Sequence, residues 1–319
     1  MRRGYGSPYR FGRLLPALLL AACAMPSSSS TGRIDGQSGF PSSSAQAAVV
    51  LAAGDIAGCD SSGDEATAGL LDSLDGPVLA LGDLAYPSGT ADEFATCYDP
   101  SWGRHQSRTW PVPGNHEYET PHAAAYFAYF GAAAGDPGEG WYSFDLGDWH
   151  LIALNSNCGE VGGCGIDSPQ ADWLRTDLAA HAATACTLAY WHHPRWSSGA
   201  EHGSDPRTDA LWRILSVAGA EVVLTGHDHE YERFVPVDAS GAASPEGMVE
   251  FVVGTGGRSL YDFAAPLASS AVRDNSTYGV LKLTLHPDAY DWLFLPAIAG
   301  GYSDAGSAEC RGPQGVPLS

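Results

Sequence analysis

The sequence predicts a mixed α/β domain in which helices pack outside two facing β-sheets. Apolar stretches with the periodicity of strands alternate with amphipathic helical stretches from residue 47 onward. The last quarter of the chain is rich in strand patterns and poor in helix patterns. This order of elements favours two sheets covered by helices over a single doubly wound sheet.

The first half of the domain begins with an apolar run that has the continuous hydrophobicity of a strand buried on both faces. A short amphipathic helix is expected over 65–74. Two segments of alternating polarity flank Gly147–Asp148 and predict a hairpin. The strands expected in this half are 47–51, 78–81, 109–112, 141–144 and 149–154.

The second half contains two helix starts in which a capping residue precedes proline at the first helical position. Ser168–Pro169 begins one helix, and Asp205–Pro206 precedes the helical stretch 211–217. No internal repeat is evident. The strands expected in this half are 187–191, 222–225, 248–253, 278–285 and 290–295.

The first 22 residues have the pattern of an export signal, because four arginines and no acidic residue accompany the apolar run 14–22. This run is too short to span a bilayer. It ends in Leu20-Ala21-Ala22-Cys23, which resembles the lipobox of bacterial lipoproteins. We expect lipidation of Cys23, with an ordinary secretory signal as the alternative, and therefore a cell-surface or secreted protein.

The composition of the following residues sets the domain boundaries. Residues 23–46 are rich in Ser, Gly and Pro and have no hydrophobic period, which predicts a flexible tether between a lipid anchor and the domain. The folded domain is expected over 47–300, followed by a C-terminal tail over 301–319.

The net charge limits the possible partners. The chain has 16 basic and 37 acidic residues, a formal charge of -21, and Lys282 is its only lysine. Proteins that bind a nucleic-acid backbone need clustered Lys and Arg, so polymeric nucleic acid is excluded as a partner. A small phosphoester held by metal ions needs little help from basic side chains. The only membrane contact expected is through the lipid anchor, and no sequence feature indicates an oligomeric state.

Seven cysteines are present, and without Cys23 an even number remains, which suggests three disulfides in an exported chain. Nearness in the sequence favours Cys158 with Cys164 and Cys59 with Cys97. Cys186 and Cys310 are then left to tie the C-terminal tail to the core. Zinc binding by thiols is the alternative, but the chain has no Cys-x-x-Cys motif.

Five short polar clusters follow expected strands over some 170 residues. They supply Asp, Tyr, Asn and His, which are the oxygen and imidazole ligands suited to two adjacent divalent or trivalent cations. Because strand carboxyl ends form a natural crevice in such folds, one crevice can gather all five, and we predict a two-metal hydrolase. The clusters are Gly54-Asp55, Gly82-Asp83-Leu84-Ala85-Tyr86, Gly114-Asn115-His116-Glu117, Trp191-His192-His193-Pro194 and Gly226-His227-Asp228-His229.

A carboxylate shared between two cations is the usual device for holding them side by side, and Asp83 is the best candidate for it. A water between the cations would lose a proton near neutral pH and become the nucleophile. The alternating pair His227 and His229 could divide between the two metals. Each cluster taken singly also has a structural explanation, since Gly-Asp after a strand is often only a turn and loop histidines are often only solvated.

The set resembles the calcineurin-like metallophosphoesterase superfamily, whose pattern runs Asp-x-His or Asp-x-Gly, Gly-Asp, Gly-Asn-His-Asp/Glu, His, Gly-His-x-His. Residues 82–86 and 226–233 are most similar to purple acid phosphatases. The resemblance covers roughly residues 47–300. It implies a four-layer sandwich of two mixed β-sheets flanked by helices, a bimetal site and phosphoester hydrolysis.

The resemblance also implies a role for each matching residue. His116 would protonate the leaving alcohol or steady the phosphoryl oxygens. His202 follows His192 at a distance similar to that of a second acid histidine in purple acid phosphatases, although a solvated loop histidine is the alternative. The first metal would be held by Asp55, Asp83, Tyr86 and His229, and the second by Asp83, Asn115, His192 and His227.

One position departs from the superfamily pattern. Ala57 stands where many members have a His or Gly, and its side chain cannot ligate a metal. The Tyr86 phenolate can replace the lost ligand, and a phenolate favours Fe(III) in the first site, with divalent Zn, Mn or Fe in the second. The alternative is that Tyr86 only packs beneath the site.

We therefore expect an acid phosphatase that acts on small phosphomonoesters. A phosphodiesterase acting on cyclic nucleotides or glycerophosphodiesters is the alternative enzyme, and a non-catalytic surface binding lipoprotein with a relic metal fold is the alternative from another class. Apart from His202, five histidines stand outside the clusters and are expected to be structural or solvated. They are His105, His122, His150, His181 and His286.

Overall fold

The computed structural model describes residues 47–312 of the 319-residue chain. The expected export signal, the lipidation site Cys23 and the tether lie outside the described residues. Within residues 47–312, none of the helices has the length and apolar character needed to cross a membrane.

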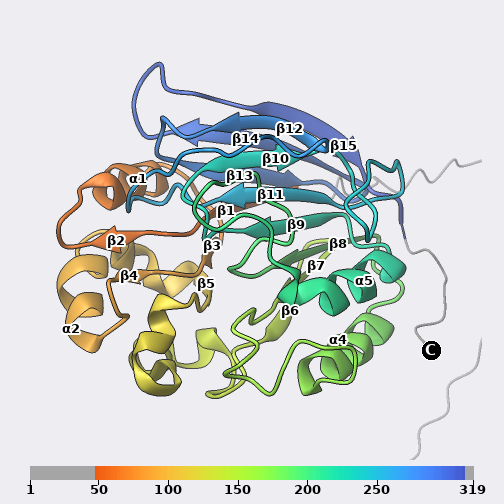
Figure 1. The fold of residues 1–319 in the computed structure, drawn as a ribbon, viewed down its shortest axis with the longest axis horizontal. Helices are drawn as coiled ribbons and strands as arrows, with labels where there is room; N and C mark the ends of the chain where they lie inside the picture. Colours follow the sequence, from red (N-terminus) through yellow and green to blue (C-terminus); the bar gives the residue numbers. More distant parts are fainter. Residues whose placement is uncertain (1–46, 313–319) are drawn as a thin grey trace, which may run out of the picture. The chain divides into compact units, whose positions relative to one another are not determined.

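Two large mixed β-sheets form the centre of the fold (Figure 1). The six-stranded sheet has the order β15-β14-β13-β1-β3-β5. In it β1, β3 and β5 are mutually parallel and β13 runs antiparallel to β1. Its strands are β1 (Ala48–Ala53), β3 (Val78–Leu81), β5 (Thr109–Val112), β13 (Gly279–Leu285), β14 (Ala289–Pro296) and β15 (Ala305–Glu309).

The seven-stranded sheet has the order β12-β10-β11-β9-β8-β7-β6. Its four central strands β7, β8, β9 and β11 are parallel, and antiparallel strands border them on both sides. The strands are β6 (Tyr142–Leu146), β7 (Trp149–Ala153), β8 (Cys186–Tyr190), β9 (Val222–Thr225), β10 (Tyr231–Phe234), β11 (Val249–Val253) and β12 (Ser270–Asp274).

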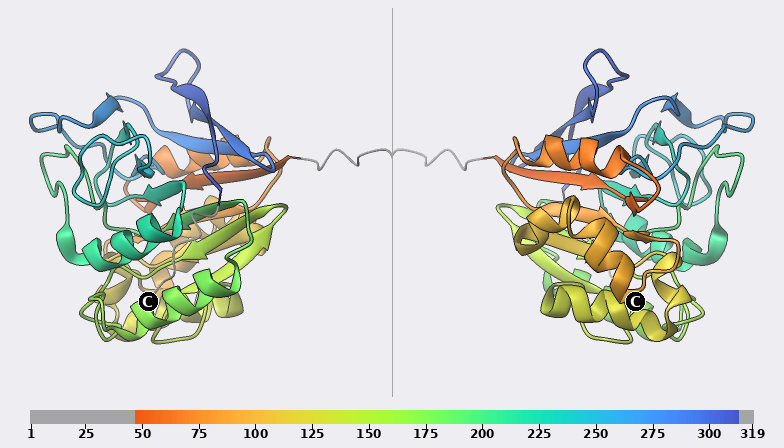
Figure 2. Two further views of the ribbon diagram at one scale, coloured as in Figure 1. Left: turned by 90° about the vertical axis from the view of Figure 1, so that its right-hand side faces the viewer. Right: turned by 90° about the vertical axis from the view of Figure 1, so that its left-hand side faces the viewer.

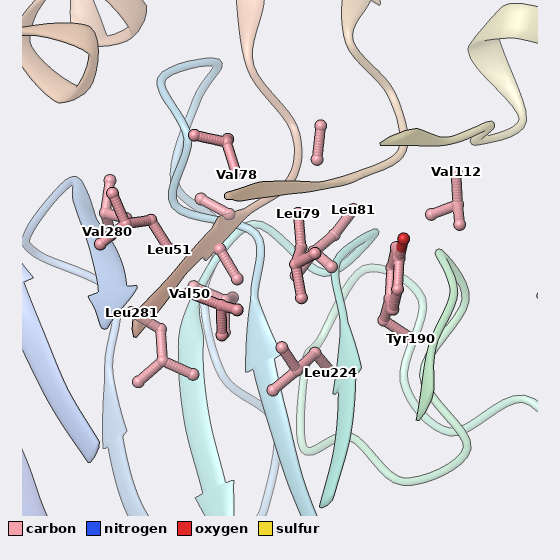
Figure 3. Close-up of a cluster of buried hydrophobic side chains, with 14 of the residues drawn as sticks. Val50, Leu51, Val78, Leu79, Leu81, Val112, Tyr190, Leu224, Val280 and Leu281 are labelled. Atoms are coloured by element: carbon pink, nitrogen blue, oxygen red, sulfur yellow. The ribbon is translucent and has the colours of Figure 1, made fainter. Parts of the chain in front are cut away.

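The two sheets share one hydrophobic core. Figure 3 shows Val50 and Leu79 of the six-stranded sheet gathered in one cluster with Tyr190 and Leu224 of the seven-stranded sheet. All four side chains are fully buried. Full burial of such a side chain stabilises the fold by about 1.5–3 kcal/mol, so the apolar runs of the sequence hold the sheets face to face.

Helices complete the layers, as Figure 2 shows for α1 beside the six-stranded sheet and for α4 with α5 beside the other. Leu174 of α4 and Leu215 of α5 pack in a second core with Ile152 and Val223 of the seven-stranded sheet. The expected mixed α/β architecture of two helix-flanked sheets is confirmed. The helices are α1 (Gly63–Leu71), α2 (Ala91–Glu93), α3 (Ala124–Phe130), α4 (Pro169–Ala180) and α5 (Asp209–Ala218).

The helix starts follow from their capping residues. The Ser168 hydroxyl accepts a hydrogen bond from the Ala171 N–H, and Pro169 occupies the first position of α4. Asp205 caps a short 3₁₀ turn in the same way, and α5 begins three residues later than this cap alone suggests. The helix expected over 65–74 begins earlier, at Gly63, and ends at Leu71.

The C-terminal segment differs from the sequence expectation. A tail was expected from residue 301, but β15 pairs antiparallel with β14 and extends the six-stranded sheet. Its sequence Ala-Gly-Ser-Ala-Glu has no apolar alternation, so the pattern gave no strand signal. The disulfide between Cys186 and Cys310 joins the end of this segment to β8 of the other sheet.

The structure contains three disulfides in the expected pairing, namely Cys59–Cys97, Cys158–Cys164 and Cys186–Cys310. They agree with an oxidising, extracytoplasmic environment.

A two-stranded parallel sheet, β2 (Ala57–Gly58) with β4 (Ala85–Tyr86), joins the loops that follow β1 and β3. Neither segment is long enough to give a strand pattern in the sequence. The pairing places Tyr86 opposite Gly58 and next to Ala57, so the position that cannot ligate a metal lies beside the tyrosine.

Candidate metal centre

The five polar clusters all follow the carboxyl ends of strands, namely β1, β3, β5, β8 and β9. The first three strands are parallel neighbours in one sheet, and β8 and β9 are parallel neighbours in the other. The carboxyl ends of the two facing sheets therefore place the clusters together, as the crevice rule for such folds predicts.

The backbone at the centre is unusual at three of these residues. Asp55, Asp83 and His227 have positive φ angles of 60°, 52° and 70°. Residues other than glycine rarely adopt this backbone region. Such a conformation costs on the order of 1–2 kcal/mol per residue and is found where the surrounding structure imposes it. Here the Asp55 N–H donates to the Gly82 carbonyl at 3.0 Å, which ties the first two loops together.

Two glycines of the motifs are required by close packing. Gly82 has φ +86°, and a side chain there would collide with the ring of His192. A Cβ at Gly114 would overlap the carboxylate of Asp83. Both positions bring backbone against a ligand-type side chain, which only glycine allows.

Four of the expected ligands meet in the first half of the centre, and one of them, Asp83, is shared with the second half. The Tyr86 hydroxyl lies 2.9 Å from Asp55 Oδ1 and 3.1 Å from His229 Nε2. It also lies 3.2 Å from Asp83 Oδ2, and His229 Nε2 lies 3.2 Å from Asp55 Oδ1. Burial, followed by the charges of Asp55 and Asp83, raises the pKa of Tyr86 above its usual range, so a phenolate there needs a nearby cation.

Four expected ligands converge in the second half of the centre. His192 Nε2 lies 3.2 Å from each of three atoms: Asp83 Oδ2, Asn115 Oδ1 and His227 Nδ1. The other ring nitrogen of His192 lies 2.8 Å from the Leu81 carbonyl oxygen. A carbonyl can only accept, so this nitrogen carries the hydrogen and a neutral His192 directs its lone pair at the three atoms.

These contacts test whether the residues fit a metal. A lone pair facing a carboxylate and an amide oxygen is unfavourable unless a proton or a cation lies among them. Burial alone would lower the pKa of His192, but Asp83 and Asp55 raise it to about 9. Burial and the charge of His192 lower the pKa of His227 to about 2. The electrostatics thus favour positive charge at this point and neutral imidazole around it, as a cation site requires.

Asp55, Asp83 and His192 offer three ligand atoms that all lie within 4.8 Å of one another. All three side chains are buried, so water can satisfy little of their charge. Oxygen and imidazole donors in this combination suit iron, zinc and manganese ions. The structure therefore brings all seven expected ligands into one group that fits metal ions.

The two expected acid histidines border this group. His116 has a side chain 32% exposed, packs on the ring of Tyr86 at 4.4 Å between centroids, and has Nε2 3.7 Å from Asp83 Oδ2. Its Nδ1 contacts the Pro87 carbonyl oxygen, which leaves Nε2 free for a ligand. His202 stacks on His227 with centroids 4.0 Å apart. Both imidazoles thus border the expected ligand set.

Glu117 is a site residue whose importance the sequence did not reveal. Its buried carboxylate accepts N–H groups from Asp83 at 2.9 Å, Leu84 at 2.8 Å and Gly114 at 2.7 Å. It therefore holds the loop of Asp83 against the loop of Asn115. Its place in the Gly-Asn-His-Glu motif was the available signal, but only the folded chain shows what the carboxylate binds.

Asp228 has a similar function for the loop of His202. Its buried carboxylate accepts hydrogen bonds from the Ser197 hydroxyl, the His202 N–H at 3.2 Å and the Gly203 N–H at 3.0 Å. The residue between the two expected ligand histidines thus positions a third histidine.

His193 is also part of the surroundings of the centre. Its Nδ1 lies 2.7 Å from the Ser156 hydroxyl and its Nε2 lies 3.2 Å from Arg207 Nη1. Both ring nitrogens are occupied, so His193 supports the ring of His227, 4.3 Å away, and does not need to be counted as a ligand.

Comparison with known proteins identifies acid phosphatases as relatives of this chain. Purple acid phosphatase 15 of Arabidopsis thaliana is 29% identical over 215 residues, which cover 56% of this chain and 40% of that protein. Acid phosphatase type 7 of Homo sapiens is 29% identical over 244 residues, which cover 65% of this chain and 54% of that protein. The chain therefore spans only about half the length of these relatives.

A solved structure supports the fold. A purple acid phosphatase from seeds of yellow lupin (Lupinus luteus) superimposes with a TM-score of 0.68 at 18% identity, covering 83% of this chain and 54% of that one. Residues 48–231 match the family described as calcineurin-like phosphoesterase, which is more than half of the chain. The chain therefore belongs to the calcineurin-like phosphoesterase family, with purple acid phosphatases among its relatives.

Proposed function

We propose that the chain is a phosphatase that hydrolyses small phosphomonoesters with two metal ions held in the candidate centre. The observation that carries the proposal is the convergence of seven buried or half-buried side chains whose oxygen and imidazole atoms lie 2.9–3.2 Å apart. Around His192 Nε2, a carboxylate oxygen, an amide oxygen and a second imidazole nitrogen meet, and positive charge at this point stabilises them.

The ligand sets follow the two halves of the centre. Asp55, Tyr86 and His229 would hold the first ion, Asn115, His192 and His227 the second, and Asp83 would serve both. When bound, two adjacent cations neutralise phosphoryl oxygens and lower the pKa of a water held between them. Asp83 supports this assignment because its Oδ2 contacts Tyr86 of the first set and His192 of the second.

Two histidines are suited to the leaving group. His116 keeps Nε2 free because Nδ1 is engaged by the Pro87 carbonyl, so in its protonated form it would donate a proton to the departing alcohol. His202 lies on the ring of His227 and would face the phosphoryl group from the other sheet's loops. Asp228 fixes the backbone of His202, which limits the cost of orienting this side chain.

The first ion would be Fe(III) and the second a divalent zinc, manganese or iron ion. Burial between Asp55 and Asp83 keeps the Tyr86 phenol neutral until a strongly polarising ion is present, which favours a trivalent partner. The predicted signature is a visible charge-transfer band of the iron-loaded protein that disappears in Tyr86→Phe.

The protein would act outside the cytoplasm, as a lipoprotein anchored through Cys23 or as a secreted enzyme. The three disulfides support an oxidising compartment. Metabolic labelling with a fatty-acid precursor would incorporate lipid into the wild type and not into Cys23→Ser.

The decisive experiment measures hydrolysis of a monoester and a diester of the same chromophore by protein of known metal content. We expect faster hydrolysis of the monoester. A faster diester reaction would instead favour a phosphodiesterase. If metal-replete protein hydrolysed no ester in a broad panel, a non-catalytic binding lipoprotein would replace the enzyme as the best explanation.

A further inference from the structure

A cavity of about 700 Å³ opens beside the metal centre and has no assigned role in the reaction. Asn115, an expected metal ligand, forms part of its wall, and the Cys158–Cys164 disulfide holds another part. The other residues that matter for its chemistry are Tyr118, Glu119, Asn157, Glu160 and Arg207.

Two residues of the cavity wall contact the residues of the centre. Asn115 Oδ1 lies 3.2 Å from His192 Nε2. Arg207 Nη1 lies 3.2 Å from His193 Nε2, and the His193 ring is 4.3 Å from that of His227. The cavity therefore adjoins the centre, and it lies next to the alcohol portion of an ester whose phosphoryl group would occupy the centre.

The charge of the cavity is negative. Arg207 is its only basic residue, and its Nε lies 2.6 Å from Asp205 Oδ2, so this positive charge is largely neutralised. Glu119 and Glu160 are exposed, and neither carboxylate has a hydrogen-bond or ion-pair partner among residues 47–312. Two uncompensated carboxylates therefore face an alcohol portion that enters here.

A buried acceptor adds to this charge. Asn157 lines the cavity and is only 6% exposed. Its amide nitrogen donates to the Pro113 carbonyl and to Asn155 Oδ1, both at 3.1 Å, which fixes the orientation of the amide. No donor within the described part of the chain reaches its side-chain oxygen, and this oxygen is left for a donor group of a ligand.

Tyr118 contributes an aromatic surface to the same wall. Its hydroxyl accepts a hydrogen bond from Asn155 Nδ2 at 2.8 Å. Burial, with a smaller contribution from Glu160, raises the pKa of Tyr118 to about 12, so the phenol stays neutral beside the carboxylate. Acidic groups, an unpaired acceptor and an aromatic ring together suit a protonated amine.

We propose that this cavity binds the alcohol portion of the substrate and selects phosphomonoesters of amino alcohols over esters whose alcohol portion carries a second negative charge. The proposal rests on the proposed phosphatase function. It narrows the substrate class, because a nucleotide polyphosphate or a sugar bisphosphate would place further anions next to Glu119 and Glu160.

The test compares ω-aminoalkyl, alkyl and ω-carboxyalkyl phosphates of matched chain length. At low ionic strength we expect kcat/KM to be roughly tenfold higher for the amine than for the carboxylate, with the alkyl ester between them. Added salt lowers this ratio, because exposed charges are screened. The double variant E119Q/E160Q lowers the ratio toward one, and Glu309→Gln, an exposed glutamate on β15, leaves it unchanged.

A binding measurement separates the two proposals. Calorimetry with ω-aminoalkyl and alkyl phosphonates, which are not hydrolysed, is expected to give tighter binding of the amine in the wild type and equal binding in E119Q/E160Q. If none of the esters is hydrolysed but this binding pattern is intact, the proposed phosphatase function is wrong and the cavity proposal stands. Equal rates and equal binding across the series, or an unchanged ratio in E119Q/E160Q, would overturn the cavity proposal alone.

Discussion

Within residues 47–312, three or more histidine and aspartate side chains come together in two places, the candidate metal centre and a second group. The second, here called the hairpin cluster, consists of Asp145 on β6, His150 on β7, Asp177 on α4 and His181 just after α4. Ligand-type atoms of Asp145, His150 and His181 also lie within 4.8 Å of one another. Residue type and proximity alone do not distinguish the two clusters.

The second ring nitrogen distinguishes them. In the candidate metal centre, His192 uses one nitrogen on a neutral backbone carbonyl, so only Nε2 faces a carboxylate, and a cation could take the place of the proton there. In the hairpin cluster, the nitrogens of His150 lie 2.8 Å from Asp145 and 2.7 Å from Asp177, so both carry hydrogens. Burial would lower the pKa of His150, but the two carboxylates raise it, so these contacts favour the protonated ring in ion pairs with the exposed Asp145 and the largely buried Asp177.

The largest expected effect comes from removing the shared carboxylate. Asp83→Asn is expected to lower kcat for a phosphomonoester by about 10³-fold or more and to reduce the metal content, because Asp83 contacts both halves of the centre. Asp145→Asn, the matched change in the hairpin cluster, is expected to leave both unchanged. Equal metal loss in the two variants, measured by elemental analysis, would show that the clusters do not differ in function.

A smaller effect is expected from the exposed imidazole of the centre. His116→Asn is expected to lower kcat by about 10²-fold for an alkyl phosphate, whose leaving group needs a proton. The loss is expected to be only a few-fold for an aryl phosphate with an acidic leaving group. Equal losses on both substrates would argue that His116 stabilises the phosphoryl group and donates no proton.

Loss of Glu117 is expected to lower activity because the Asp83 and Asn115 loops would no longer be held in position. Glu117→Gln replaces one carboxylate oxygen by an amide nitrogen, which cannot accept the N–H groups of the Asp83 and Asn115 loops. We expect kcat to fall about tenfold and the free energy of unfolding to fall by about 2 kcal/mol. Unchanged urea denaturation together with unchanged kcat would mean that the loops hold their geometry without this carboxylate.

Substitutions in the hairpin cluster are expected to have the smallest effect on activity and to change the stability of the fold instead. The raised pKa of His150 means that its ion pairs stabilise fully below pH 6.5 and lose this contribution as the pH rises through the folded-state pKa. The lowered pKa of Asp177 means that its share is lost as the pH falls below its ordinary value of 3.8.

His150→Asn is therefore expected to cost about 2 kcal/mol of unfolding free energy between these limits, and less at higher pH. Activity is expected to change less than about twofold. Chemical denaturation of both proteins across this pH range measures the difference. A difference independent of pH, or a loss of bound metal in the variant, would contradict the ion-pair assignment.

Much of the fold could be predicted because its elements are locally encoded. The runs 78–81, 109–112 and 222–225 match β3, β5 and β9 at both ends, since each is a short apolar stretch bounded by glycine or proline signals. The edge strand β15 was missed, because its small polar residues pair through backbone and a disulfide and not through a hydrophobic face.

In the candidate site, too, the locally encoded residues could be predicted and the groups that act on other loops could not. The glycine and ligand-type residues at strand ends form short local motifs, so their positions could be recognised in the printed chain. The supporting groups could not, since Glu117 and Asp228 act through backbone N–H groups on other loops. The cavity beside Asn115 likewise depends on segments around residues 118, 158 and 206 that meet only in the folded chain.

The sequence by itself determined which side chains are available at the carboxyl ends of the strands, because the hydrophobic period places the strands and the motifs follow them. Only the tertiary structure decided which histidines have one ring nitrogen left for a cation, as His192 does, and which have both nitrogens held by carboxylates, as His150 does. The physical reason is that the hydrogen-bond partner of the other ring nitrogen comes from a distant part of the chain. For His192 this partner is the carbonyl of Leu81, which lies 111 residues away.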